Sequence, residues 1–116
     1  MDYRPILLQL GITPNYKDFH QMLTVLGIVE ANPEALTMVT KWLYPAVAEQ
    51  HKTNWRQVER SLRIVVRVAW GTNRDFLQKF SPIPVKKRTT VSQFITIFWK
   101  VSTLCESIGH NTFNYK

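Results

Sequence analysis

The stretch "NWRQVERSLRIVVRVAW", residues 54–70, decides the fold because its two halves differ in character. Its first half is charged, whereas its second half is almost entirely apolar. Apolar residues recur at spacings of three and four, which predicts an amphipathic helix that begins after Asn54 and runs to about Trp70. The charged face of such a helix is either solvated or presented to a binding partner. The charged residues on it are Arg56, Glu59, Arg60 and Arg63.

The chain has 116 residues, which is enough for one domain with its own core, so we expect residues 1–116 to form a single domain. Hydrophobic residues make up 45% and charged residues 20%, the balance of a folded globular protein. The formal net charge of +7 favours a polyanionic partner, either DNA, RNA or an anionic membrane surface. A basic surface that binds nothing is the alternative.

Cys105 is the single cysteine, so the sequence contains no disulfide framework and a reducing compartment is the simplest interpretation. No apolar run is long enough to span a bilayer. The first residues, "MDYRPILLQLG", include an acid and only a short apolar stretch, unlike a signal peptide. We therefore expect a soluble cytoplasmic protein that does not associate with membranes.

The rest of the chain has weak strand signals, and its spacing predicts a compact all-α bundle of six helices that contains a helix-turn-helix. Asn15 and Asn32 are expected to cap helices, with Pro33 in a first helical position. Pro45 is expected to break or restart a helix, and Gly71 to end the long one. The predicted helices span about 16–30, 33–43, 46–52, 55–70, 73–80 and 90–107, with a frayed tail after residue 109.

The apolar faces of these helices predict the core. Trp42, Trp70 and Trp99 also stand at helical spacings, so we expect them in the core as well. The other predicted core residues are Phe19, Met22, Leu23, Leu26, Val29, Leu36, Val39, Leu43, Val58, Leu62, Val65, Val66, Ala69, Phe94, Ile97, Phe98 and Val101.

Residues 44–62 fit the helix-turn-helix pattern, which needs a small residue in its first helix because the second helix crosses close to it. Ala48 is that small residue, with Val47 packing beside it, and "KTN", residues 52–54, forms the turn. Asn54 caps the second helix, with Gln57 three residues on to complete a capping box. Val58 and Leu62 are the apolar pair of the second helix.

Two positions depart from this pattern. His51 stands where an apolar residue is commoner, and Lys52 where glycine is commoner. We expect His51 to be a partly buried packing residue rather than a metal ligand, since no second ligand is suitably spaced.

The outward face of the second helix carries side chains suited to reading bases in the major groove. Arginine can bind guanine through two hydrogen bonds, glutamine can bind adenine, and glutamate can accept from the amino group of cytosine. Glu59 favours base reading, since phosphate would repel it. The alternative is a solvated ion pair between Glu59 and Arg63, worth about 0.3 kcal/mol. The candidate base-reading residues are Arg56, Gln57, Glu59, Arg60 and Arg63.

The run "KKRTT", residues 86–90, precedes a predicted helix N-terminus. Free backbone N–H groups there, with the hydroxyls of Thr89 and Thr90, would bind phosphate. A solvated charge run is the alternative. Lys17 is a weaker candidate, and Trp55 would either pack on a sugar-phosphate edge or cover the turn. The candidate phosphate-contacting residues are Lys41, Asn54, Trp55, Lys86, Lys87, Arg88 and Thr90.

The sequence has no catalytic constellation: it lacks a glycine-rich phosphate loop, a carboxylate pair with a plausible cleft, and a Cys/His/Asp set. Its three histidines are scattered. We therefore expect neither an enzyme nor a cofactor or metal site.

Three stretches, "GITPNYK", "ALTMVTKWLYPAVAEQHKTNWRQVERSLRIVVRVAW" and "TTVSQFI", resemble the C-terminal effector domain of the stage-zero sporulation response regulator. That regulator is the master transcription factor of endospore formation. The resemblance covers residues 9–104 approximately and leaves 105–116 unexplained. It implies a six-helix domain that binds double-stranded promoter DNA through a helix-turn-helix. It also implies a head-to-tail dimer on adjacent TGTCGAA-type boxes.

The base-reading Glu and Arg of the family motif match Glu59 and Arg60, and the next arginine matches Arg63. Gln57 stands where the family has an arginine, and Arg56 where it usually has a serine, so the target sequence is expected to differ there. The family protein also carries a phosphoacceptor receiver domain, which these 116 residues do not contain. We expect control by protein concentration or by another protein instead.

Two functional hypotheses follow. The first is a sequence-specific DNA-binding transcription regulator. The second is an interaction module that has kept the fold but lost base reading, and that antagonises or partners a sporulation regulator or RNA polymerase. Gln57 and Trp55 are the residues that favour the second hypothesis.

Overall fold

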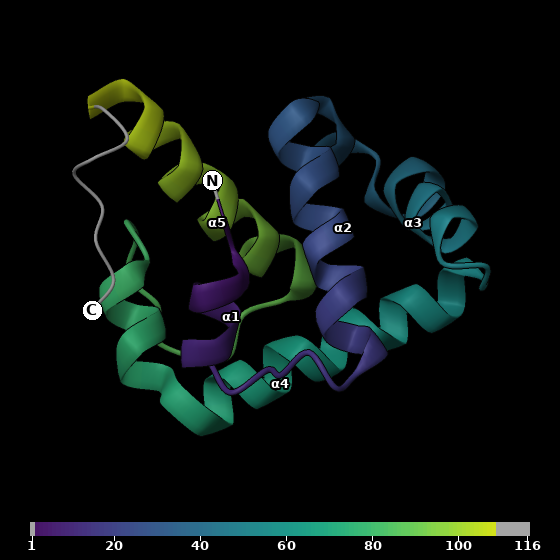
Figure 1. Cartoon of the computed structure of the whole chain (residues 1–116). Helices are drawn as coiled ribbons and strands as arrows, with labels where there is room; N and C mark the ends of the chain where they lie inside the picture. Colours follow the sequence, from purple (N-terminus) through teal and green to yellow (C-terminus); the bar gives the residue numbers. More distant parts are fainter. Residues whose placement is uncertain (1, 109–116) are drawn as a thin grey trace.

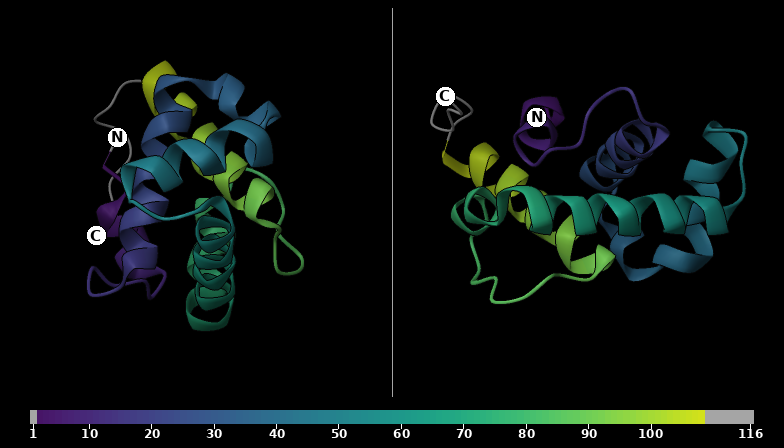
Figure 2. Two further views of the ribbon diagram at one scale, coloured as in Figure 1. Left: turned by 90° about the vertical axis from the view of Figure 1, so that its right-hand side faces the viewer. Right: turned by 90° about the horizontal axis from the view of Figure 1, so that it is seen from below.

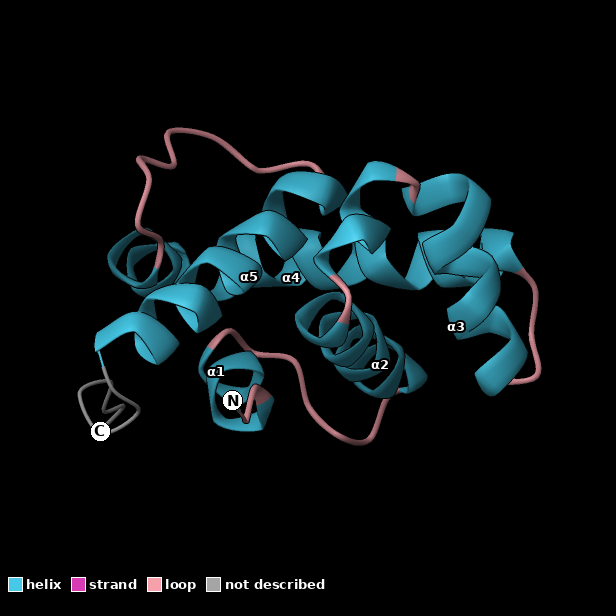
Figure 3. Ribbon diagram, turned by 90° about the horizontal axis from the view of Figure 1, so that it is seen from above, coloured by secondary structure: helices cyan, strands magenta, loops and turns pink. Residues whose placement is uncertain are grey.

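The computed structural model describes residues 2–108, and every regular element in that range is helical (Figure 3). The all-α prediction is therefore confirmed. The α-helices are α1 (Arg4–Gln9), α2 (Lys17–Ala31), α3 (Tyr44–Gln50), α4 (Trp55–Phe80) and α5 (Val91–Ile108). Two short segments join α2 to α3: a 3-10 helix, η1 (Pro33–Thr37), and a π-helix, η2 (Val39–Leu43). The predicted tail after residue 109 lies outside the described residues.

The long helix α4 forms one side of the molecule, at the bottom of Figure 1, and α2 crosses over it. α5 packs against both α2 and α4, while α3 packs on the N-terminal part of α4. Seen from below, α4 lies in front of the other helices, so one of its faces is covered by no other helix of residues 2–108 (Figure 2).

The predicted core is largely confirmed. Val58, Leu62, Val65, Val66 and Ala69 of α4 are buried. So are the predicted residues of α5, and those of α2 except Leu23, which is partly buried. Leu36, Val39, Trp70 and Trp99 are likewise partly buried against the core. Trp42 is the clear error, since 41% of it is exposed.

The predicted count of six helices is wrong because short segments near the N-terminus and before α3 differ from the prediction. α1 was missed because a six-residue helix is too short to show a period, although Ile6 and Leu7 are fully buried. The predicted helix 33–43 is instead η1 followed by η2, since the backbone leaves the helical region at Met38 (φ −137°, ψ 53°). Pro45 lies in the first turn of α3, where a proline is tolerated, so the predicted restart of a helix at Pro45 is confirmed.

The boundaries of two other helices also differ from prediction. Gly71 does not end the long helix, which continues to Phe80 with one non-helical residue, Asn73 (φ −148°, ψ 62°). The Asn73 side chain accepts a hydrogen bond from the backbone N–H of Phe76 at 3.3 Å, so the predicted helix start at Asn73 is confirmed as a kink within α4. Asn15 does not cap α2, because Tyr16 occupies the cap position without a side-chain hydrogen bond.

The Glu30 carboxylate links three parts of the described chain. Glu30 on α2 accepts hydrogen bonds from the hydroxyl of Tyr3 at 2.6 Å and from the hydroxyl of Ser102 on α5 at 2.9 Å. Burial disfavours the Glu30 carboxylate, while the hydrogen bonds from Tyr3 and Ser102 favour it, and the pKa of Glu30 lies below the ordinary value of 4.5. The ionised side chain therefore links α2 with α5 and with the residue that precedes α1.

Candidate nucleic-acid interface

α3, the turn after it and the first part of α4 form the predicted helix-turn-helix. Val47 and Ala48 of α3 are buried where α4 passes, as the motif requires. In the turn, Lys52 adopts a left-handed backbone (φ 54°), and the N–H of Thr53 donates to the carbonyl of Ala48 at 2.9 Å. Since only glycine enters that region without a steric cost, the geometry explains why glycine is commoner at the position of Lys52.

The start of α4 is fixed by Asn54. Its backbone is extended, and its side-chain oxygen accepts a hydrogen bond from the backbone N–H of Gln57 at 3.0 Å, so the predicted N-cap is confirmed. His51 is half-buried, and its Nε2 lies 2.7 Å from the hydroxyl of Thr24 on α2. The prediction that His51 is a packing residue is therefore confirmed, and its hydrogen bond attaches the turn to α2.

The uncovered face of α4 carries the predicted base-reading residues. Arg56, Arg60 and Arg63 are exposed, whereas Gln57 and Glu59 are half-buried at the edges of the face. Arg56, Arg60 and Arg63 thus lie on the side of α4 away from the buried Val58 and Leu62, while Glu59 and Gln57 line clefts on its two flanks. A convex helix with donors and acceptors along one face matches the width of a DNA major groove.

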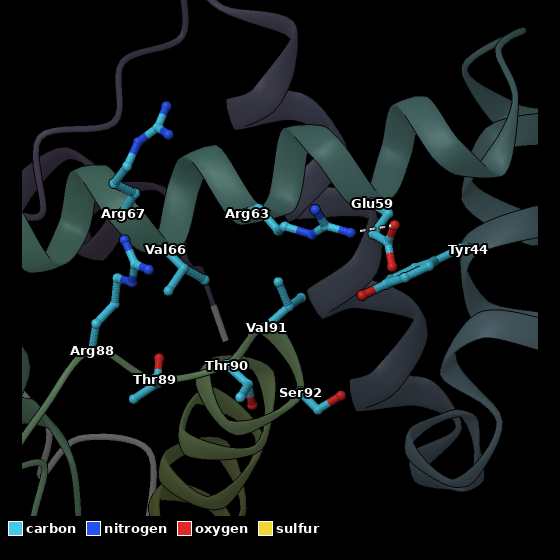
Figure 4. A pocket seen from close by; sticks show the side chains of 10 residues that line it. All are labelled: Tyr44, Glu59, Arg63, Val66, Arg67, Arg88, Thr89, Thr90, Val91 and Ser92. Atoms are coloured by element: carbon cyan, nitrogen blue, oxygen red, sulfur yellow. Dashed lines mark hydrogen bonds and ion pairs between the residues drawn. The ribbon is translucent and has the colours of Figure 1, made fainter.

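Glu59 and Arg63 form an ion pair in the unbound protein, with 2.7 Å between Oε1 of Glu59 and a guanidinium nitrogen of Arg63 (Figure 4). Tyr44 at the start of α3 lies beside them and is 4% exposed. Burial, reinforced by the charge of Glu59 and opposed by that of Arg63, raises the pKa of Tyr44 to about 12. Tyr44 therefore presents a neutral hydroxyl near the ion pair at physiological pH.

A cleft of about 510 Å³ separates α4 from the loop before α5 and from the first turn of α5 (Figure 4). Glu59, Arg63 and Tyr44 lie at one end of it, while Arg88 reaches from the loop toward Val66 and Arg67 at the other. The full lining is Tyr44, Glu59, Arg63, Val66, Arg67, Arg88, Thr89, Thr90, Val91 and Ser92. The cleft therefore joins the predicted base-reading face to the predicted phosphate-binding loop.

Comparison with known families gives a match over residues 4–101 to the family described as "Sporulation initiation factor Spo0A C terminal". The chain belongs to this family. The family is a helical DNA-binding domain of sporulation transcription regulation, and it is not an enzyme family. The match also extends the resemblance found in the sequence toward the N-terminus, so that it includes α1.

In this Spo0A C-terminal domain, the predicted phosphate-contacting residues are dispersed. Lys86, Lys87, Arg88 and Thr90 lie together in and after the loop, and all four are exposed. Lys41 lies on η2, outside the cleft. The four residues of the loop and of its end therefore lie on one side of α4, and Lys41 lies away from them.

Trp55 lies in the first turn of α4 and is 38% exposed. The guanidinium of Arg56 lies 5.4 Å from the centre of the Trp55 ring, which is within cation–π range. Trp55 is therefore accessible for the predicted contact with a sugar-phosphate edge, and Arg56 lies beside it.

Thr90 corrects one part of the phosphate prediction. Its backbone N–H donates to Oε1 of Gln93 at 2.9 Å, and the backbone N–H of Gln93 donates to the hydroxyl oxygen of Thr90 at 3.1 Å. These two bonds make a complete capping box, so the N–H of Thr90 is not free as expected. The arginine side chains and the hydroxyls remain as donors on this side of α4.

Arg67 is the residue that sequence reasoning missed. It is exposed, and it follows Arg60 and Arg63 by seven and four residues on the same helix, so it continues their row. The helical period alone indicates this position, although Arg67 stands within the mainly apolar second half of residues 54–70.

A smaller cleft, of about 240 Å³, lies on the other flank of the arginine row. Lys17 and Asp18 of α2 line it together with Gln57 and Arg60. α4 is thus flanked on both sides by depressions that contain a positively charged side chain.

Among the helices of residues 2–108, none combines the length and the apolar character of a membrane span. The same residues contain no group of three or more His, Cys, Asp or Glu side chains that could hold a metal ion.

Proposed function

We propose that this domain is a sequence-specific DNA-binding transcription regulator, and that the N-terminal half of α4 enters the major groove. The observation that carries the proposal is the uncovered face of α4, on which Glu59 stands among arginines. An all-cationic face would bind any duplex, whereas a carboxylate in the groove is tolerated only where the bases offer it a donor or where it orients an arginine.

Base contacts are assigned to the side chains on that face. Arg60 is suited to guanine and Gln57 to adenine. Glu59 either accepts from a cytosine amino group or holds Arg63 against a guanine, and its 2.7 Å ion pair with Arg63 favours the second role. The proposed base-reading set is Arg56, Gln57, Glu59, Arg60 and Arg63.

Backbone contacts are assigned to residues around the helix-turn-helix and in the loop before α5. These fix the position of α4 on the duplex without reading sequence. The proposed set is Lys41, Asn54, Trp55, Lys86, Lys87, Arg88 and Thr90. Family membership supports TGTCGAA-type boxes as targets and a head-to-tail pair of domains on adjacent boxes. RNA polymerase is the proposed partner at the promoter.

Two substitutions test this division of labour. Arg60→Ala is expected to cost about 1–3 kcal/mol on the target box and to relax the base preference at one position. Lys87→Ala is expected to weaken binding to all duplexes alike and to reduce the salt slope by about one unit. Selection from random duplexes gives the target, and fluorescence anisotropy over a salt series gives both quantities. Equal losses of specific and nonspecific binding in both variants would contradict the assignment.

The interaction-module hypothesis makes the opposite prediction for the wild type. A module that had lost base reading would form no duplex complex that survives near physiological salt, and selection would return no consensus. A consensus box bound at that salt concentration would exclude this hypothesis as the main role of the domain.

A further inference from the structure

We propose that the cleft between α4 and the start of α5 seats one phosphate of the DNA backbone, held by Arg67 and Arg88 with Thr89. The inference rests on the proposed function, and it adds the path of one DNA strand. It also assigns a role to Arg67, which was not among the residues expected to contact DNA.

The charges in the cleft are unevenly distributed. Arg63 is neutralised by Glu59 at one end. No hydrogen bond or ion pair within residues 2–108 engages the guanidinium of Arg67 or Arg88 at the other end. Arg88 points from the loop toward α4, whereas the guanidinium of Arg67, at the rim of the cleft, is directed away from Arg88 (Figure 4). A change of the Arg67 side-chain rotamer would let both uncompensated arginines bind one anion. Because Glu59 repels that anion, it should lie toward Arg67 and Arg88.

Thr89 supplies a second, independent observation. Its hydroxyl oxygen is closed off from solvent and has no hydrogen-bond partner within the described part of the chain, although Thr89 lines the cleft. A buried hydroxyl without a partner is uncommon in folded proteins. A phosphate oxygen drawn in by the arginines would provide that partner after a rotation of the Thr89 side chain.

The site does not depend on the N-terminus of α5. Thr90 and Gln93 satisfy one another through the capping box, which occupies two of the backbone N–H groups at that end. The arginine side chains, and the hydroxyl of Thr89 once its side chain rotates, are therefore the groups available to a phosphate at this end of the cleft, whereas the Ser92 hydroxyl points away from it (Figure 4). Val66 and Val91 form the apolar part of the lining, which suits a deoxyribose.

The position of the cleft determines how the duplex lies. It occupies one flank of the arginine row, and the smaller cleft with Lys17 and Arg60 occupies the other. With α4 in the major groove, the two strands that border the groove pass on either side of it. One strand then runs between α4 and the loop of residues 81–90, with a phosphate beside Arg67.

Duplexes that each carry one uncharged methylphosphonate linkage test the seat directly. Wild-type protein is expected to lose about 3- to 10-fold in affinity when one particular linkage, or its neighbour, is neutralised. Arg67→Ala and Thr89→Val are expected to weaken binding to the unmodified box and to show little further loss at that same linkage. Lys100→Ala removes one exposed charge from α5 outside the cleft, and it should retain the wild-type response.

If the affinity losses caused by each substitution and by each neutral linkage were additive at every linkage, the proposed phosphate seat would be wrong. If selection from random duplexes still returned a consensus box in that case, only the seat would be wrong. If the wild type had no base preference, both the proposed function and the seat would be wrong. Titration with inorganic phosphate, followed by NMR, distinguishes a free anion from DNA. Suppose that inorganic phosphate bound tightly at Thr89 while the substitutions and the neutral linkages had independent effects on DNA binding. The cleft would then be a site for a small anion, and the proposed seat would be wrong.

Discussion

Lys52→Gly should stabilise the domain, although it removes a side chain and a charge. Lys52 has φ 54°, in the turn that sets the angle between α3 and α4. For a residue with a Cβ, this left-handed region costs about 1–2 kcal/mol of conformational free energy. Glycine avoids that cost, but because its unfolded state has more conformational freedom, folding costs it about 0.5–1 kcal/mol more than alanine. The net gain expected in the free energy of unfolding is about 0.5–1 kcal/mol.

Urea denaturation followed by circular dichroism measures this difference, and Lys52→Ala is the matched control. It removes the same charge and side chain but keeps the Cβ, so its stability should stay near that of the wild type. A glycine variant no more stable than the alanine variant would show that the left-handed backbone carries no strain. The explanation for the usual glycine at this position would then be wrong.

Two further predictions concern stability elsewhere. Gly11→Ala should destabilise by about 1–3 kcal/mol in urea, because φ is +89° and an added Cβ would lie 2.6 Å from Cγ2 of Thr72. Gly71→Ala is its control and should stabilise by about 0.5–1 kcal/mol, since Gly71 is helical with open space beside it. Folding lowers the pKa of Glu30 below its unfolded value of 4.5. The ionised carboxylate therefore stabilises the folded state above pH 4.5, and this contribution is lost as the pH falls through the lower pKa of the folded state. Thermal melts between about pH 6 and pH 3 should show that loss, and Glu30→Gln should flatten the curve; an unchanged slope would contradict the role of the carboxylate.

The parts of the fold that follow from the sequence are those with a long, regular period. The helices α2, α4 and α5 have 15, 26 and 18 residues, which is about four turns or more each, so the spacing of apolar residues is enough to determine their buried faces. Trp42 shows where this reasoning fails. It lies in the π-helix η2, which has more residues per turn than an α-helix, so a period of 3.6 assigns it to the wrong face. The local apolar pattern does not indicate the π geometry.

The candidate site divides in the same way. The Asn54 cap and the Glu59–Arg63 pair depend on residues three or four apart, and both could be predicted. The cleft could not, because it forms only when the loop of residues 81–90 returns to α4. Nothing in the sequence of the loop alone indicates that Arg88 lines the same cleft as Arg67.

The arginines of α4 are not equivalent before DNA arrives, and this difference decides which of them is best placed to read a base. Arg56 lies over Trp55, and Arg63 is paired with Glu59. Freeing either one costs about 0.2–1 kcal/mol, the worth of an exposed cation–π contact or ion pair. No hydrogen bond or ion pair within residues 2–108 engages Arg60. Arg60 can therefore turn toward a guanine without losing a contact, whereas Arg63 would carry Glu59 with it into the groove. Discrimination should accordingly depend on Arg60 for one base and on the Glu59–Arg63 pair, acting as a unit, for its neighbour.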